Sequence, residues 1–88
     1  MKINFKKIQI QQVDGTTQEV DIANAFSKAI YNSTPSLPIA VAMQEIYMTG
    51  TADLNKEQVT EIRKTMEQIG ATAYIKMALY PIFDKIEE

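Results

Sequence analysis

Apolar residues recur at three- and four-residue steps between Leu54 and Gly70, which predicts an amphipathic helix. Asn55 is the expected N-cap, because its side chain can accept from the amide of Gln58 while Gln58 reaches back in a variant of the capping box. Gly70 is expected to end the helix in the left-handed conformation. The apolar stripe consists of Val59, Ile62, Met66 and Ile69. A helix of this length is marginal alone, so the stripe must pack against the rest of the chain.

The segment from Lys2 to Ile10 alternates apolar and polar residues, which predicts a strand. The apolar residues occupy odd positions before Lys6 and even positions after Lys7. A slip of one residue exchanges the two faces of a strand. Either a bulge lies at this point, or the two halves of the segment face different neighbours.

Asp14 and Gly15 mark a turn, and residues 16–20 are expected to form the returning strand of a hairpin. A two-residue turn would place Val20 opposite Gln9, on the wrong face. A three-residue loop with Gly15 in the left-handed position instead places Val20 opposite Ile8. We therefore predict the three-residue loop.

Two helices are expected between this hairpin and Leu54. Asp21 is the predicted cap of a helix running to about Tyr31. Pro38 suits the first turn of the next helix, where its missing amide costs nothing, and Gly50 ends that helix. The predicted buried stripes are Ile22, Phe26, Ala29 and Ile30 in the first helix, and Ile39, Met43, Ile46 and Tyr47 in the second.

Thr72 is the expected cap of a last helix, which we predict to continue, kinked, through Pro81. The helical stripe consists of Ile75, Ala78, Leu79, Ile82, Phe83 and Ile86. Together these elements predict one α+β domain spanning residues 1–88, with an N-terminal two-stranded β-hairpin followed by a bundle of about four short helices.

Composition is that of an ordinary soluble protein, with 45% hydrophobic and 23% charged residues. No apolar run is long enough for a membrane helix, and no signal segment is evident, so a cytoplasmic location is expected. The net charge of −2 and the scattered basic residues argue against a general nucleic-acid binder.

Candidate chemistry is sparse, because the chain has no histidine and no cysteine. Glu57 and Glu61 lie one turn apart, but they sit opposite the apolar stripe and are interpreted as a solvated face. The three glycines are isolated, so a phosphate-binding loop is excluded, and the aspartates lack the spacing of a calcium loop. We predict no catalytic residue, no metal site, no cofactor and no small-molecule substrate.

Methionine and tyrosine offer possible protein contacts, since both suit adaptable interfaces. Met43 and Met66 are expected in the core. The hairpin also leaves strand edges that lysines can either expose or protect. The candidate interaction surface comprises Tyr74, Tyr80, Met48, Met77, Lys2, Lys6 and Lys7.

Several stretches resemble short proteins of tailed bacteriophages and prophages. They are M-K-I-N-F at 1–5, D-G at 14–15, A-N-A-F-S-K-A-I at 23–30, I-Y-M-T-G at 46–50, L-N-K-E-Q at 54–58 and Y-I-K-M-A-L at 74–79. The resemblance implies a small virion-morphogenesis or accessory protein, for example of the tail-assembly-chaperone type, without catalytic residues.

The leading hypothesis is therefore a non-enzymatic protein-interaction domain that binds a protein partner or itself. A small nucleic-acid-binding regulator is the alternative, with Lys2, Lys6 and Lys7 as its patch. An enzyme using carboxylates or tyrosine is a third hypothesis, which would require a deep pocket where such side chains converge.

Overall fold

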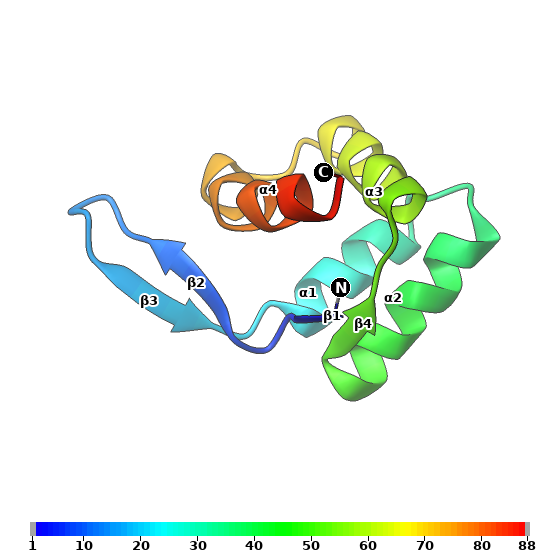
Figure 1. Cartoon of the computed structure of the whole chain (residues 1–88), viewed down its shortest axis with the longest axis horizontal. Coiled ribbons are helices and arrows are strands. Elements are labelled where there is room, and N and C mark those ends of the chain that lie inside the picture. The colour runs from blue at the N-terminus through cyan, green and yellow to red at the C-terminus, as the bar shows by residue number, and fades with distance from the viewer. Residues whose placement is uncertain (1, 88) are drawn as a thin grey trace.

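The computed structural model describes residues 2–87 and shows the predicted α+β fold (Figure 1). Met1, the first residue of the M-K-I-N-F stretch, lies outside the described residues, as does Glu88. The elements in chain order are β1 (Lys2–Asn4), β2 (Ile8–Gln11), β3 (Thr17–Val20), α1 (Ala23–Tyr31), α2 (Leu37–Thr49), β4 (Thr51–Asp53), α3 (Lys56–Gln68) and α4 (Ala73–Glu87).

The predicted first strand is two strands with different partners, so the phase slip is not a simple bulge. Strand β1 pairs antiparallel with β4, and β2 pairs antiparallel with β3. The short strand β4 was not expected from the sequence. Phe5 lies at the break, where its amide donates to the Gly50 carbonyl at 2.7 Å and its carbonyl accepts from the Ile22 amide at 2.9 Å. Its buried ring stacks on Phe26 with centroids 5.1 Å apart.

The hairpin has the predicted register, with Ile8 opposite Val20. The Gln12 amide donates to the Thr16 carbonyl at 2.6 Å, which closes a loop of three residues. Gly15 has a φ of +88°, the left-handed conformation that this loop requires. The face shared by Ile8 and Val20 therefore points towards the helices, as the sequence predicts.

The capping box of α3 is confirmed in both directions. The Gln58 amide donates to Asn55 Oδ1 at 2.9 Å, and the Asn55 amide donates to Gln58 Oε1 at 3.0 Å. Gly50 ends α2 with a φ of +82°, and Gly70 follows α3 with a φ of +67°. Met43 and Met66 are buried in the core, as expected.

Helix α1 differs from its prediction in two respects. Its N-cap is Ile22 and not Asp21, because the contact between Ile22 and the Phe5 carbonyl fixes where the helix begins. The Asp21 carboxylate still accepts from the Ala23 amide at 3.0 Å. Ala29 is exposed and not part of the buried stripe, because the core contacts of α1 centre on Phe26 and its neighbours.

Helix α4 continues past Pro81, so the predicted continuation is confirmed. The Thr72 carbonyl accepts from the Lys76 amide, which starts the helical ladder. Leu79 and Phe83 are fully buried, and the other four residues of the predicted stripe are half-buried against the core. The α4 stripe is therefore confirmed, with its centre on Leu79 and Phe83.

The helices form two adjoining layers (Figure 1). Helix α1 packs mainly on α2, whereas α4 lies along α3 and covers β2. The β2–β3 hairpin projects from the body, so that its loop is far from the helices. None of the described helices is long and apolar enough to cross a membrane.

Candidate functional site

The outward side of α2 is apolar, although it faces solvent. Leu37, Val41 and Met48 are 80%, 62% and 80% exposed, and Gln44 lies between them. These positions recur at four- and three-residue steps, so they form one stripe along the helix. The opposite side carries the four buried residues of α2, which are Ile39, Ala42, Met43 and Ile46.

Tyr47 corrects one prediction, because it is 51% exposed and not part of the buried stripe. Ala42 is buried in its place, which turns the core-facing side of α2 away from Tyr47. Tyr47 therefore lies at the boundary between the core and the outer stripe. From this position its ring is partly exposed to solvent and lines one side of a groove between α1 and α2.

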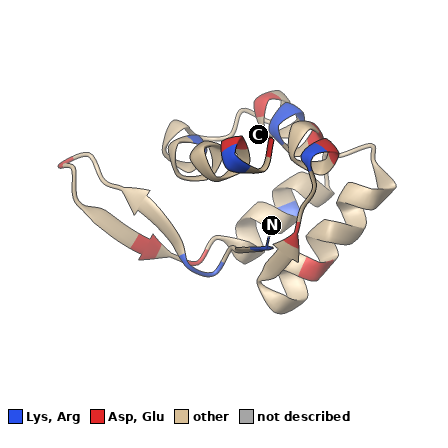
Figure 2. Cartoon of the chain, viewed as in Figure 1, with Lys and Arg blue, Asp and Glu red and all other residues tan. Residues whose placement is uncertain are grey.

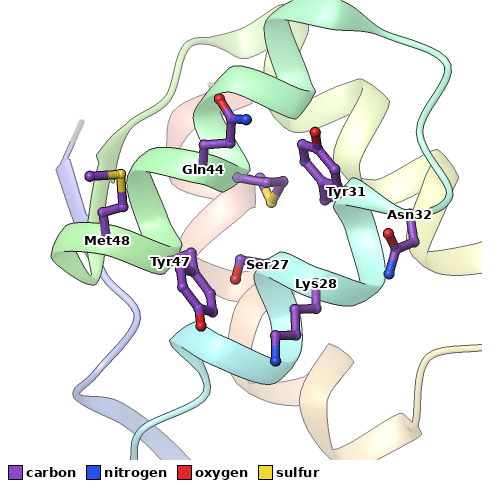
Figure 3. A pocket seen from close by; sticks show the side chains of 8 residues that line it. Ser27, Lys28, Tyr31, Asn32, Gln44, Tyr47 and Met48 are labelled. Carbon is purple, nitrogen blue, oxygen red and sulfur yellow. The ribbon is translucent and has the colours of Figure 1, made fainter.

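A groove of about 510 Å³ separates α1 from α2 beside this stripe. Its base includes the buried side chains of Met43 and Ser27, and Tyr31 and Tyr47 stand at its rim from different helices (Figure 3). The Lys28 ammonium lies 5.6 Å from the centre of the Tyr47 ring, a cation–π arrangement that holds the charge at the groove edge.

The stripe and the groove rim together form what we call the α1/α2 face: Tyr31, Leu37, Val41, Gln44, Tyr47 and Met48. Charges are scarce around it, since α1 carries only Lys28 and α2 carries only Glu45 (Figure 2). Helices α3 and α4 are instead banded with charges of both signs. The α1/α2 face is therefore an apolar surface on a part of the molecule with few charges.

The predicted interaction residues do not converge on one surface. Met48 belongs to the α1/α2 face. Tyr74 borders a different groove, of about 370 Å³, between the hairpin base, α1 and the start of α4. Met77 is exposed on the outer side of α4, away from both the groove at Tyr74 and the groove at Tyr47 as their lining residues show.

Tyr80 is half-buried between α3 and α4, where it joins the two helices. Its hydroxyl donates to Glu67 Oε1 at 2.8 Å, and the Arg63 guanidinium lies 4.7 Å from its ring centre. Arg63 also pairs with Asp84 and with Glu87. Tyr80 is therefore engaged in holding two helices together.

The three candidate lysines are exposed. Lys2 lies on β1, and Lys6 and Lys7 lie in the connection to β2. The Lys6 side chain lies across Gly50, so closely that a Cβ built there would be 2.6 Å from it. Glycine is therefore favoured at position 50 for two reasons. The backbone has a positive φ, and a side chain there would clash with Lys6.

Tyr80 and Glu67 share a hydrogen bond, and the pKa values of both are displaced from their ordinary values. Burial, reinforced by the hydrogen bond to Glu67, raises the pKa of Tyr80 to about 12, which makes its hydroxyl a poor acid or base near neutrality. Hydrogen bonds from Tyr80 and Lys76 lower the pKa of Glu67. Glu57 and Glu61 are exposed, in line with the solvated face predicted for them. Among residues 2–87, no three acidic side chains are grouped as a metal site.

Sequence reasoning found Met48 but missed the rest of the α1/α2 face. The available signal was the composition of residues 37–49, L-P-I-A-V-A-M-Q-E-I-Y-M-T, which contain a single charge. A helix that is apolar on all sides is normally buried on all sides. The groove itself had no such signal, because it depends on how α1 and α2 cross.

Comparisons with protein-family models, with curated proteins and with solved structures find no match to the chain. Function is therefore inferred from the geometry of the described residues.

Proposed function

We propose that this chain is a non-enzymatic protein-interaction domain that binds through its α1/α2 face. One observation carries the proposal: α2 presents Leu37, Val41 and Met48 to solvent on the side opposite the core. Exposed apolar patches of this extent on small domains commonly mark sites of protein contact. Tyr47 adds an aromatic side chain of the kind enriched at interfaces.

A protein fits this face better than the other ligand classes. A small-molecule site is a concavity with a few converging polar groups, whereas the outer stripe of α2 is convex and extends along the helix. A nucleic-acid site needs clustered basic residues, and Lys28 is the single basic residue of α1 and α2. The nucleic-acid alternative therefore finds no support in this face.

The phage-like stretches of the sequence supply a setting for the proposal. In that setting the domain is an assembly accessory protein of a phage or prophage, and the α1/α2 face is the surface it contributes to assembly. A chromosomal position among tail or head genes would support this setting. A position in an operon of unrelated host genes would contradict it while leaving the interaction proposal intact.

Photo-crosslinking in the cells that naturally carry the gene tests the interaction directly. Tyr47 is replaced by benzoylphenylalanine, and the matched control carries the same residue at Glu61, on the charged outer side of α3. We expect a discrete crosslinked protein species at position 47 and none at position 61. Absence of any crosslinked protein at position 47, or equal crosslinking at both positions, would overturn the proposal.

A further inference from the structure

We propose that the occupant of the α1/α2 face is a second copy of this chain, packed as a two-fold dimer with the two α2 helices roughly parallel. The inference rests on the proposed function and specifies its partner. A two-fold interface brings the same surface of both copies together, so the surface must complement itself. The α1/α2 face meets this requirement in its area and in its charges.

The area of the face approaches that of a stable dimer. Taking about 150 to 250 Å² for a large side chain in full exposure, its five apolar residues present on the order of 600 Å². A standard interface buries about 800 Å² on each partner. The exposed side chain of Gln44 within the stripe, and those of Pro38 and Glu45 beside it, extend the area towards that value.

Helices α1 and α2 each carry one charged residue, and these two charges are opposite in sign and lie on opposite sides of the face. Lys28 lies on the α1 side, beyond the Tyr47 ring. Glu45 lies on the far side of the stripe from Tyr47. It precedes Tyr47 by two residues, which correspond to about 200° around a helix. A face with one positive edge and one negative edge is electrostatically complementary to a second copy in one orientation and repulsive in another.

The favourable orientation follows from the symmetry. A two-fold axis that runs along α2 makes the two helices parallel and exchanges the two edges, so that Lys28 faces Glu45 of the second copy. An axis that crosses α2 makes the helices antiparallel and keeps the edges, so that like charges share an edge. Lys28 and Glu45 also lie at similar heights along α2, since Lys28 contacts Tyr47. The charges therefore select the parallel arrangement.

The natural absence of cysteine allows a direct test of this arrangement. In the parallel dimer Leu37 meets Leu37 of the second copy, and Met48 meets Met48. In the antiparallel dimer no more than one of these positions can meet its own counterpart, because residues 37 and 48 are about 16 Å apart along the helix. We therefore use Leu37→Cys and Met48→Cys as separate variants under mild oxidation, with Met77→Cys on α4 as the exposed control.

We expect both α2 variants to form disulfide-linked dimers at least tenfold faster than Met77→Cys. Crosslinking of only one α2 variant would overturn the parallel arrangement. Crosslinking of neither, or a faster reaction at Met77→Cys, would overturn the α1/α2 face as the site of self-association.

Charge exchange in the cysteine-free chain gives an independent readout by light scattering. We expect Lys28→Glu and Glu45→Lys each to raise the dimer dissociation constant about tenfold, because each places like charges at both edges. Combining them restores opposite charges, and we expect the dissociation constant to return towards that of the natural chain. Equal weakening in the single and double variants would contradict the pairing.

The failures of the two proposals are distinguishable. If the inference alone fails, the purified chain is a monomer while crosslinking at Tyr47 in cells captures a protein of a different mass. If the proposed function fails, position 47 captures no protein, and the cysteine variants on α2 react no faster than the control.

Discussion

Helices α2 and α3 are each 13 residues long, and each buries four side chains, yet their outer sides differ. The outer side of α3 carries charged and polar residues, including Glu57, Glu61 and Lys64. The outer side of α2 carries Leu37, Val41 and Met48. The outer side of α3 is thus polar and suited to contact with water, whereas α2 is apolar on both its inner and its outer side.

The helix starts show the same difference. Asn55 satisfies the first turn of α3 through a full capping box. Ser36 occupies the N-cap of α2 without a side-chain cap bond. The first turn of α3 is therefore supported by a side-chain cap as well as by packing, while the first turn of α2 has no side-chain cap bond. Two helices that bury the same number of side chains in the core can therefore differ in their caps and in the polarity of their outer sides.

The largest effects are expected on the inner sides, where the two helices are alike. Ile46→Ala in α2 and Ile62→Ala in α3 each remove a fully buried side chain, and each is expected to lower the free energy of unfolding by about 2 to 5 kcal/mol. Urea titration at low protein concentration measures both. A loss below about 1 kcal/mol at Ile46 alone would show that α2 does not share the core equally.

The polar contact between α3 and α4 gives a pH-dependent contrast with the nearly uncharged α1 and α2 pair. The pKa of Tyr80 is about 12 in the folded chain and about 10 when unfolded. The resulting stability is therefore present below about pH 10 and is lost as the pH rises towards 12. Thermal unfolding between pH 8 and 12 should show a smaller decline in Tyr80→Phe than in the natural chain. Tyr74→Phe, at an exposed tyrosine, should follow the natural curve.

The two N-caps provide a smaller, matched comparison. Asn55→Ala removes a side-chain acceptor from the Gln58 amide, and it is expected to lower the free energy of unfolding by about 1 kcal/mol. Ser36→Ala removes no cap bond and should cost well under half of that. Denaturant midpoints of the two variants measure the difference, and equal losses would contradict the distinction between the helix starts.

The smallest effect is expected on the outer side of α2, provided that the chain is monomeric. Val41→Glu should change the free energy of unfolding of the monomer by no more than about 0.5 kcal/mol, as is usual for exposed positions. At concentrations where the natural chain associates, the same variant should remain monomeric by light scattering. A large loss of monomer stability would show that Val41 is buried within the monomer and not available to a partner.

Local patterns predicted the hairpin register, the α3 capping box and the passage of α4 through Pro81. Each depends on residues close together in sequence, such as Gly15 in its loop or Asn55 and Gln58 in theirs. The start of α1 was misplaced because the Phe5 carbonyl, far away in sequence, holds Ile22. Strand β4 was missed because three residues with a single buried side chain carry no strand pattern of their own. Tyr47 was assigned to the core because periodicity gives the direction in which an apolar stripe points. It does not give how much of the helix surface on either side of that direction the neighbouring elements cover.

The sequence by itself determined the number and type of most elements, because periodicity, caps and turn residues act over a few positions. The apolar composition of α2 can also be read from the sequence, although no interaction surface was predicted from it. Only the tertiary structure decided which side of α2 is covered. That choice depends on which part of the α2 surface is in contact with α1 and the rest of the core. It leaves Leu37, Val41 and Met48 exposed to solvent. The α1/α2 groove and the opposite placement of Lys28 and Glu45 likewise exist only once the two helices are packed, because both depend on how α1 lies against α2.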